Sequence, residues 1–370
     1  MNALTLTRKF QAMNKLLLFL MLGLCGFGVY AIYSATYWHE NTNFWTSQIR
    51  WIFICLPVYF IIAFNDYRWV RLGAIPIYVL SIILLVLVLF IGIKVSGARS
   101  WLNLGFGSFQ PSQLAIFGGV LLFATFLSAS PGMNTALRIL ICLGIAGIPC
   151  LLILVQPYLG GTLVWIPVLF AMFFLAGIRK RYLIAMMLLI LCAMPLMYRF
   201  ILKPFQQKRI TSFLDPLSDP QDSGWNIIQS LNAIGSAGFW GKGFKNPDSL
   251  NALGYIPKTI SHTDFVFTVF SEQHGFFGSM VLLSTLGILL LVGLYIASQA
   301  RDQMGRLLSA GLVMLLFTHI FMNLGMTVAV TPITGLPLPM ISYGGTFLLI
   351  TISCLGLLQS IWIHRKAVSA

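Results

Sequence analysis

Two carboxylic acids near the start of one predicted membrane span are the residues best suited to chemistry. The chain has only nine acidic residues, and Asp264 and Glu272 lie eight positions apart at the outer start of an apolar run. An ionisable group at membrane depth is costly, so each is a functional candidate by default. On a helix, residues eight apart share roughly one face. Asp264 can instead cap a helix, but a cap explains neither the nearby His262 nor the second carboxylate.

Two histidines beside these acids raise the question of a metal. His262 and His274 each lie two positions from one of the two carboxylates. Their spacing matches no zinc signature. A carboxylate such as Asp264 can hold a divalent ion here only if substrate oxygens complete the coordination shell. The residues themselves therefore predict no certain cofactor, and the metal stays open.

Two further outer loops have an unusual composition. The segment 96–105 places the cation Arg99 and the interfacial aromatic Trp101 just before the next span. The segment 331–345 is dense in proline and glycine and ends with Ser342 and Tyr343 near its last glycines, so it cannot be a helix. Non-helical backbone at membrane depth is tolerated only where it lines a cavity or is buried in protein. This segment is therefore either a rigid connector or the wall of a cavity that opens outward.

Composition places these residues in a membrane protein. Hydrophobic residues make up 58% of the chain and charged residues 9%, against about 45–50% and about 25% in soluble domains. A chain of 370 residues cannot hide that much apolar surface from water. The composition argues against a soluble enzyme, a disordered protein and a nucleic-acid partner. The net charge of +14 then reports membrane topology before it reports any polyanion.

Ten apolar runs are predicted as membrane-spanning helices, which need about 20 mostly apolar residues, and the second run extends a little further back than its first apolar residue. The runs are 16–35, 51–64, 72–93, 112–128, 137–155, 162–176, 182–201, 275–297, 307–324 and 342–364. If the N-terminus is cytoplasmic, the lysines and arginines of the short loops gather in the inside segments, and the alternation holds at every loop. We therefore predict an all-α integral membrane protein, one transmembrane domain over residues 1–370, with ten helices and both termini cytoplasmic.

A long polar stretch, about 202–262, separates the seventh and eighth spans on the predicted outer side. Its Asp, Pro, Gly and Ser content predicts loops with short helices, and a loop of this length is either functional or disordered. The apolar spacing over 225–234 predicts an amphipathic helix. Such a helix lies on the membrane surface or packs over the ends of the spanning helices, and the two arrangements are not exclusive.

Short motifs run in one order across nearly the whole chain. They are Phe109-Gln110-Pro111-Ser112, Gln156-Pro157 with Leu159-Gly160, Leu214-Asp215-Pro216 with Ser218-Asp219-Pro220, Ile228-Gln229-Ser230, Ala233-Ile234-Gly235-Ser236, Gly241-Lys242-Gly243, His262-Thr263-Asp264-Phe265, Asn323-Leu324-Gly325-Met326, and Gly335-Leu336-Pro337-Leu338-Pro339 with Ser342-Tyr343-Gly344-Gly345. At these motifs the chain strongly resembles the SEDS family (shape, elongation, division and sporulation proteins). Its length and its two Asp-Pro pairs resemble the cell-elongation members more than the division members.

The resemblance implies a ten-helix peptidoglycan glycosyltransferase in the bacterial cytoplasmic (inner) membrane. It would polymerise lipid II on the outer face, by inverting hexosyl transfer, together with a cross-linking class B penicillin-binding protein of the elongation complex. The family's essential acid falls on Asp264, which suits a general base for the attacking hydroxyl. The departing lipid diphosphate needs cations or a divalent metal, Mg²⁺ or Mn²⁺. The substrate-binding candidates are Arg99, Trp101, Lys208, Arg209, Lys242, His262, Glu272, Ser342 and Tyr343.

Four positions depart from the family pattern. Gln113 and Ile116 stand where the family usually has an acid and a lysine, Tyr158 where it has an aspartate, and Ser100 where it has an arginine. Either these sites assist the chemistry without performing it, or this chain is a divergent or weakened member. Two alternative functions therefore stay open, a lipid II flippase or transporter and a weakly active scaffold for wall synthesis. The scarcity of ionisable groups in the spans speaks against ion-coupled transport.

Overall fold

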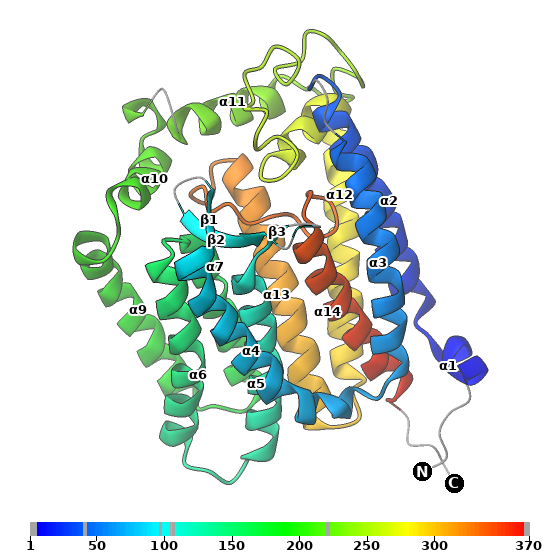
Figure 1. Cartoon of the computed structure of the whole chain (residues 1–370), viewed down its shortest axis with the longest axis vertical. Coiled ribbons are helices and arrows are strands. Elements are labelled where there is room, and N and C mark those ends of the chain that lie inside the picture. Colours follow the sequence, from blue (N-terminus) through cyan, green and yellow to red (C-terminus); the bar gives the residue numbers. More distant parts are fainter. Residues whose placement is uncertain are drawn as a thin grey trace.

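A bundle of long helices forms most of the molecule (Figure 1). The computed structural model describes residues 6–39, 43–95, 98–103, 105, 108–219 and 223–365; of the motif residues, Pro220 lies outside this part. The helices are α1 (Leu6–Ala12), α2 (Lys15–Thr36), α3 (Phe44–Phe64), α4 (Val70–Ile91), α5 (Pro111–Ala129), α6 (Thr135–Val155), α7 (Leu159–Leu163), α8 (Trp165–Leu175), α9 (Lys180–Phe200), α10 (Pro204–Leu214), α11 (Ser223–Gly235), α12 (Val266–Ser298), α13 (Gln303–Thr327) and α14 (Gly345–Ile363), with short 3₁₀ turns at Tyr67–Trp69 and Pro216–Ser218.

The predicted membrane helices are present, because runs of about 20 apolar residues satisfy every backbone group internally as helices. Within the described residues, nine helices are long and apolar enough to cross a membrane. The sixth predicted span, 162–176, corresponds to the shorter pair α7 and α8, which together cover Leu159–Leu175. The chain is thus an all-α, multi-pass membrane protein, while the count of ten and the cytoplasmic termini stay predictions.

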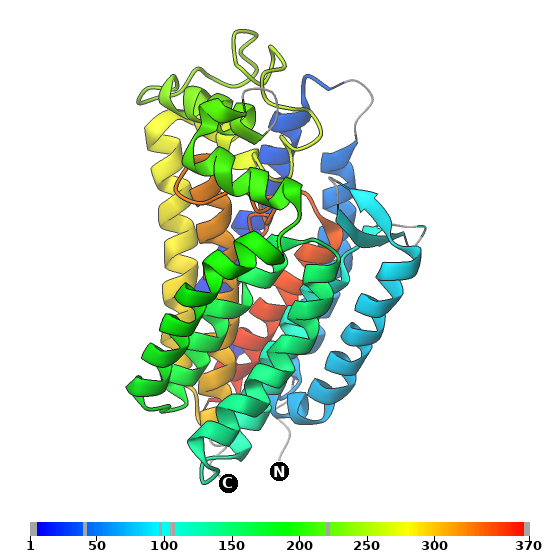
Figure 2. The same cartoon turned by 90° about the vertical axis from the view of Figure 1, so that its left-hand side faces the viewer.

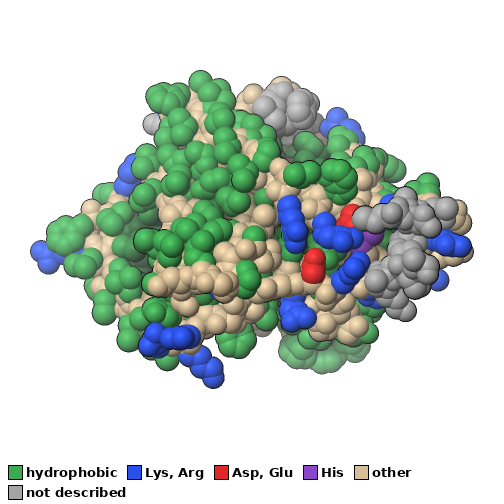
Figure 3. Space-filling model, turned by 90° about the horizontal axis from the view of Figure 1, so that it is seen from below, with side chains coloured by type: hydrophobic (Ala, Val, Ile, Leu, Met, Phe, Trp, Pro, Cys, Tyr) green, Lys and Arg blue, Asp and Glu red, His purple; other side chains and the backbone are tan. Residues whose placement is uncertain are grey.

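The two ends of the bundle differ. One end carries α10, α11 and the connections around them, and we call it the outer end; the described part of the chain starts and stops near the other end (Figure 1). Figure 3 looks onto that inner end and shows several lysine and arginine side chains on it, with two acidic side chains among those at one side. The orientation of the bundle in the membrane stays a prediction from the charge pattern of the loops.

Helices α13 and α14 form the centre of the bundle. In the most apolar stretch of each, 72% and 89% of the residues are buried, and α14 packs most extensively along α3. By contrast, none of the residues of α9 is buried. Figure 2 shows α9 and α10, in green, running over the outside of the bundle. The protein core therefore lies around α13 and α14, close to the predicted site.

A small antiparallel sheet at the outer end was not predicted. Strands β1 (Ile93–Val95), β2 (Ala98–Asn103) and β3 (Ser108–Phe109) pair in the order β1-β2-β3. The sheet occupies the segment that we expected to be a plain loop, and it carries Arg99 and Trp101 on β2. Strands of two to six residues carry too little periodicity to be recognised from sequence.

Helix α12 is broken near its outer end, at Gly275. The backbone of Gly275 has φ 65° and ψ −160°, which is not helical. The segment 238–243 supplies backbone partners at this break, since Phe276 N donates to Gly238 O and Lys242 N donates to Glu272 O. A Cβ on Gly275 would lie 2.3 Å from Gly241 N, so only glycine fits this close approach. The break thus joins the outer loop to α12.

The predicted amphipathic helix is α11, and it packs over the ends of the spanning helices. Ile227 and Ala233 of α11 are buried against Phe265 and Val269 at the start of α12. The Ser230 hydroxyl also donates to Thr327 O at the end of α13, at 2.7 Å. The predicted packing over the helix ends is thus present, α11 covers the region around Asp264, and a place on the membrane surface stays a prediction.

Candidate active site

Asp264 lies in a tight turn that immediately precedes α12. The N–H groups of Thr263, Asp264 and Phe265 all donate to Ile260 O, at 3.0 to 3.3 Å. The turn occupies the outer end of the bundle, and α12 begins two residues later, at Val266. Asp264 is therefore fixed by its own backbone turn, and the N-cap position of α12 is occupied by Phe265 and not by Asp264.

Three consecutive carbonyls of this turn are held by partners from distant parts of the chain. Tyr343 N donates to His262 O at 3.0 Å. The Ser342 hydroxyl donates to Thr263 O at 2.5 Å, and the Asn323 amide donates to Asp264 O at 3.1 Å. Each partner orients one peptide unit. The result is a backbone around Asp264 that is tied on both sides to α13 and to the proline-rich segment.

The proline-rich segment, 331–344, lies inside the protein and forms one wall of the site. Leu336 and Leu338 are fully buried, as expected for non-helical backbone at this depth. Gly335 has φ 67°, and a Cβ at that position would lie 3.7 Å from Asp264 Oδ2. The Tyr158 hydroxyl donates to Gly335 O at 3.3 Å. Asp264, Gly335 and Tyr158 are therefore neighbours.

The carboxylate of Asp264 is available for proton transfer. Within the described residues neither carboxylate oxygen of Asp264 accepts a hydrogen bond, and the side chain is only partly exposed. Burial raises the pKa of Asp264 to about 6, although the positive charge of Arg209 acts in the opposite direction. A carboxylate with this pKa is a stronger base than an ordinary aspartate and remains largely ionised at neutral pH.

His262 and Tyr343 form an aromatic wall on the other side of the turn. The His262 ring stacks on Phe44 of α3 with ring centroids 4.1 Å apart, and Tyr343 contacts both rings. Burial is the main cause that lowers the pKa of His262 to about 4, so the imidazole is neutral at physiological pH. Of the predicted substrate-binding residues, His262 thus lies in the turn that carries Asp264, and Ser342 and Tyr343 bond to that turn.

Glu272 does not share the site. It lies inside α12, whereas Asp264 precedes the helix, so the expectation of one shared helical face is not met. The Glu272 side chain is completely buried and forms an ion pair with Lys242 at 2.8 Å. Glu272 Oε1 also accepts a hydrogen bond from Leu250 N at 2.7 Å. This pair ties the outer loop to α12 at the break.

The other predicted cations have separate surroundings. Lys208 pairs with Asp219 at 3.0 Å, and Asp219 Oδ2 accepts from Ser223 N at the start of α11. Arg99 donates to Leu89 O at 3.1 Å, at the end of α4. Trp101 lies opposite Ile93 in the sheet. Arg209 of α10 is the cation whose charge reaches both Asp264 and Tyr158.

Two of the four positions that depart from the family pattern meet next to Asp264. Gln113, at the start of α5, faces the Tyr158 hydroxyl together with Gln110. Ile116 and Ser100 are buried, in α5 and in β2. The neutral residues Gln113 and Tyr158 therefore replace two family charges at one place. The motif pattern pointed to both, but Asn323 and Gly335 had no predicted role, because only the fold brings them to Asp264.

The residues themselves do not form a preassembled metal site. In the part of the chain that the structure describes, no three His, Cys, Asp or Glu side chains come together as ligands. Mg²⁺ is nevertheless often bound through one or two carboxylates with substrate phosphates as further ligands. The single carboxylate of Asp264 fits that arrangement, and the ion stays a prediction.

This fold and site define a multi-pass membrane protein with one acidic site at its outer end, and the comparisons name its class. The family model for FtsW, RodA and SpoVE, described as cell cycle protein, matches residues 15–367, and the chain belongs to this family. Peptidoglycan glycosyltransferase MrdB of Escherichia coli is 34% identical, over 95% of this chain and 94% of its own length. Stage V sporulation protein E of Bacillus subtilis is 32% identical, over 96% and 98%.

Solved structures agree with this assignment. A chain of a peptidoglycan synthase complex that coordinates polymerization and crosslinking superposes with a TM-score of 0.82, at 30% identity, over 95% of this chain and 98% of that chain. The rod shape determining protein RodA of Thermus thermophilus gives a TM-score of 0.70 at 28% identity, over 95% and 97%.

Proposed function

We propose that this protein is a peptidoglycan glycosyltransferase that polymerises lipid II into glycan strands during cell elongation. The observation that carries the proposal is the Asp264 carboxylate. This carboxylate is partly buried, has a raised pKa and accepts no hydrogen bond within the described residues. It lies in a turn whose three consecutive carbonyls each accept a hydrogen bond from a distant part of the chain. Relatives over nearly the full length bear the name peptidoglycan glycosyltransferase, which supports the same reaction here.

In the proposed reaction, Asp264 takes the proton from the 4-hydroxyl of one sugar. The oxygen of that hydroxyl attacks the anomeric carbon of another sugar. The bond from the anomeric carbon to the lipid diphosphate breaks, and the configuration inverts. A base with a pKa near the working pH combines adequate basicity with a large ionised fraction. The fixed turn supports this role because catalytic groups must be held in their reactive geometry.

Arg209 is the cation that we propose for the leaving diphosphate. Lys208 and Lys242 already pair with carboxylates, and Arg99 donates to a backbone carbonyl. The charge of Arg209, by contrast, acts directly on Asp264. A positive charge beside the developing negative charge stabilises the transition state. Asp264 is the residue that would help to hold Mg²⁺ or Mn²⁺, and such an ion would supply further charge stabilisation.

We further propose a class B penicillin-binding protein as the cross-linking partner, within an elongation complex in the cytoplasmic (inner) membrane. The support is the similarity to a chain from a peptidoglycan synthase complex that couples polymerization with crosslinking. The elongation role is supported by the similarity to RodA and to MrdB.

The decisive experiment reconstitutes the full chain in liposomes with labelled lipid II, alone and with the partner. The wild type should form glycan strands, and Asp264→Asn should form none while it remains folded. The matched control is Asp248→Asn, because Asp248 is an exposed acid of the same outer region and should keep full activity. Strand synthesis by Asp264→Asn would contradict the proposal. Transfer of lipid II across the bilayer without strands would indicate a flippase, and neither activity would indicate a scaffold.

A further inference from the structure

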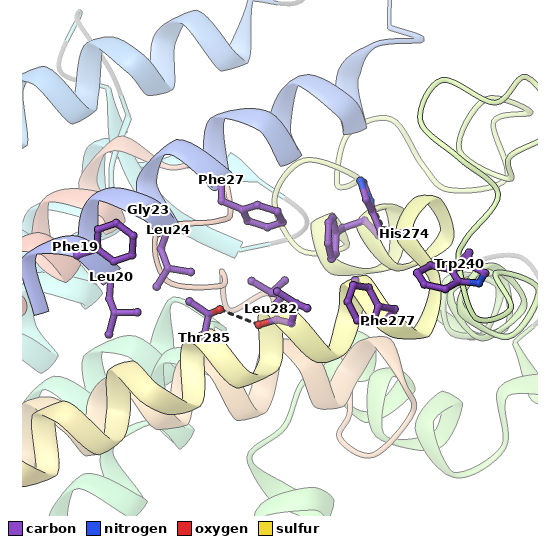
Figure 4. Close-up of a pocket in the computed structure, with 13 residues that line it drawn as sticks. Phe19, Leu20, Gly23, Leu24, Phe27, Trp240, His274, Phe277, Leu282 and Thr285 are labelled. Atoms are coloured by element: carbon purple, nitrogen blue, oxygen red, sulfur yellow. Dashed lines mark hydrogen bonds between the residues drawn. The ribbon is translucent and has the colours of Figure 1, made fainter. Parts of the chain in front are cut away.

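A groove between α2 and α12 lies apart from the Asp264 site. It has a volume of about 500 Å³. Its floor consists of buried apolar side chains, among them Leu20 and Leu24 of α2 and Phe270 and Leu282 of α12. Figure 4 shows the side chains of both helices along the groove, with Trp240 at the outer end. Phe19 and Trp240 line its rim and are 74% and 72% exposed. The groove is therefore open at the outer surface of the helix bundle.

The polar groups inside the groove are already satisfied. The Nδ1 atom of His274 lies 3.1 Å from Phe270 O, and its Nε2 atom lies 2.8 Å from the Tyr30 hydroxyl. Because a carbonyl only accepts, Nδ1 carries the proton and Nε2 accepts from Tyr30. The walls therefore offer an occupant apolar contact and no free hydrogen-bonding group from this pair. That chemistry suits a hydrocarbon chain.

A lysine lies above the outer end of the groove. Lys245 Nζ is 4.2 Å from the ring centroid of Tyr37 and 5.5 Å from that of Tyr33. Within the described residues no carboxylate pairs with Lys245. Tyr37 lies seven positions beyond Tyr30 along the sequence, about 10 Å on a helix. A leaflet with its headgroups is about 20 Å deep, so a phosphate at Lys245 would place a chain in the groove below it.

The groove is short along α2. Its lining on α2 runs from Phe19 to Phe27, about 12 Å along the helix axis. Lipid tails are as apolar as leucine, so burial in the groove gives no hydrophobic gain over the bilayer. Retention of one lipid must then depend on packing and on headgroup charge.

We propose that the groove holds one acyl chain of an anionic outer-leaflet phospholipid, whose phosphate pairs with Lys245. The site is independent of the proposed glycosyltransferase reaction. The occupant would contact Phe270 and His274 on the outer part of α12. This part of the helix begins next to Asp264 and extends to the break at Gly275. A bound lipid would thereby stabilise this part of the helix against movement at the break.

The test uses two glycines of α2 as a matched pair. Gly23 lines the groove and Gly26 does not, yet a Cβ on either meets nothing within 4 Å. Gly23→Leu therefore fills the groove, and Gly26→Leu adds the same side chain outside it. The full chain is delipidated in detergent and titrated with phosphatidylglycerol, phosphatidylethanolamine or a polyprenyl diphosphate. Thermal midpoints and native mass spectrometry report binding.

We expect phosphatidylglycerol to raise the midpoint of the wild type and of Gly26→Leu in a saturable way, and to leave Gly23→Leu unchanged. Lys245→Gln should weaken binding about fivefold, the effect of one lysine near an anionic lipid. An equal response of Gly23→Leu, equal binding of the two phospholipids, or retention of the polyprenyl diphosphate instead would each overturn the proposal. If Gly23→Leu does not fold, unchanged binding by Lys245→Gln is the overturning result.

Discussion

The side-chain amide of Asn323 donates a hydrogen bond to the carbonyl oxygen of Asp264 at 3.1 Å. The same nitrogen donates to Leu336 O at 2.8 Å. One completely buried side chain of α13 therefore connects the turn before α12 with the proline-rich segment. The position of the candidate base is thus set by residues 59 and 72 positions away.

Replacement of Asn323 by leucine should destabilise the protein and lower strand synthesis. The substitution leaves two backbone carbonyls without this donor, and each unsatisfied buried acceptor costs about 1–3 kcal/mol. We expect a lower thermal midpoint and a lower kcat, because Asp264 loses its fixed position. Asn103→Leu, at an exposed position of β2, is the control. A variant at Asn323 with wild-type stability and kcat would show that this contact does not position the site.

The pH dependence of strand synthesis should report Asp264. The carboxylate acts only when ionised, so kcat/KM should fall about tenfold per pH unit below the pKa of about 6. Since the charge of Arg209 favours the ionised form, Arg209→Gln should move this limb to higher pH. Arg209→Lys keeps the charge and should leave the limb near its original position. A limb that stays in place in Arg209→Gln would argue against this electrostatic coupling.

The raised pKa of Asp264 also predicts how stability depends on pH. The folded protein binds this proton more tightly than the unfolded chain, so the contribution of Asp264 to stability is lost as pH rises from about 4 to about 6. Asp264→Asn never ionises and avoids this loss. The free energy of unfolding of the variant minus that of the wild type should therefore be about 1–2 kcal/mol larger at pH 7.5 than at pH 4, after discounting for partial exposure. Thermal unfolding of both proteins at the two pH values measures the difference, and a constant difference would contradict it.

The helices could be predicted from the sequence, because each long apolar run is a local signal. The start of α12 could not be located from the run 275–297, since the helix begins at Val266 and is broken at Gly275. That break depends on backbone bonds from the segment 238–243, which no local pattern reveals. The sheet β1-β2-β3 was missed for a different reason, because its strands are too short to show a recognisable periodicity.

The site was predictable in part. The scarcity of acids pointed to Asp264, and the proline and glycine content correctly predicted a non-helical segment, which the structure places at 331–344, directly before α14. The contacts of Tyr158 and Asn323 needed the fold, because Tyr158 donates to Gly335 O and Asn323 donates to both Asp264 O and Leu336 O, all far away along the sequence. Glu272 was expected beside Asp264, yet its carboxylate contacts Lys242 at the break in α12.

The ion pair between Lys242 and Glu272 allows a test of a structural role against a role in substrate binding. The Glu272 side chain is fully buried and that of Lys242 is 22% exposed. Lys242→Met leaves a buried charge without its partner, which typically costs about 3–5 kcal/mol. Glu272→Gln together with Lys242→Met removes both charges and should restore much of the lost stability. Thermal unfolding of the two single variants and the double variant measures the coupling energy.

Activity of the same variants completes the test. If the pair only ties the outer loop to α12, the double variant should regain strand synthesis together with stability, and its KM for lipid II should match the wild type. A double variant that is stable but has a strongly raised KM would instead place Lys242 or Glu272 in contact with the substrate. We expect the first result, because Lys242 N also donates to Glu272 O, so the backbone holds the loop in place while the two side chains change.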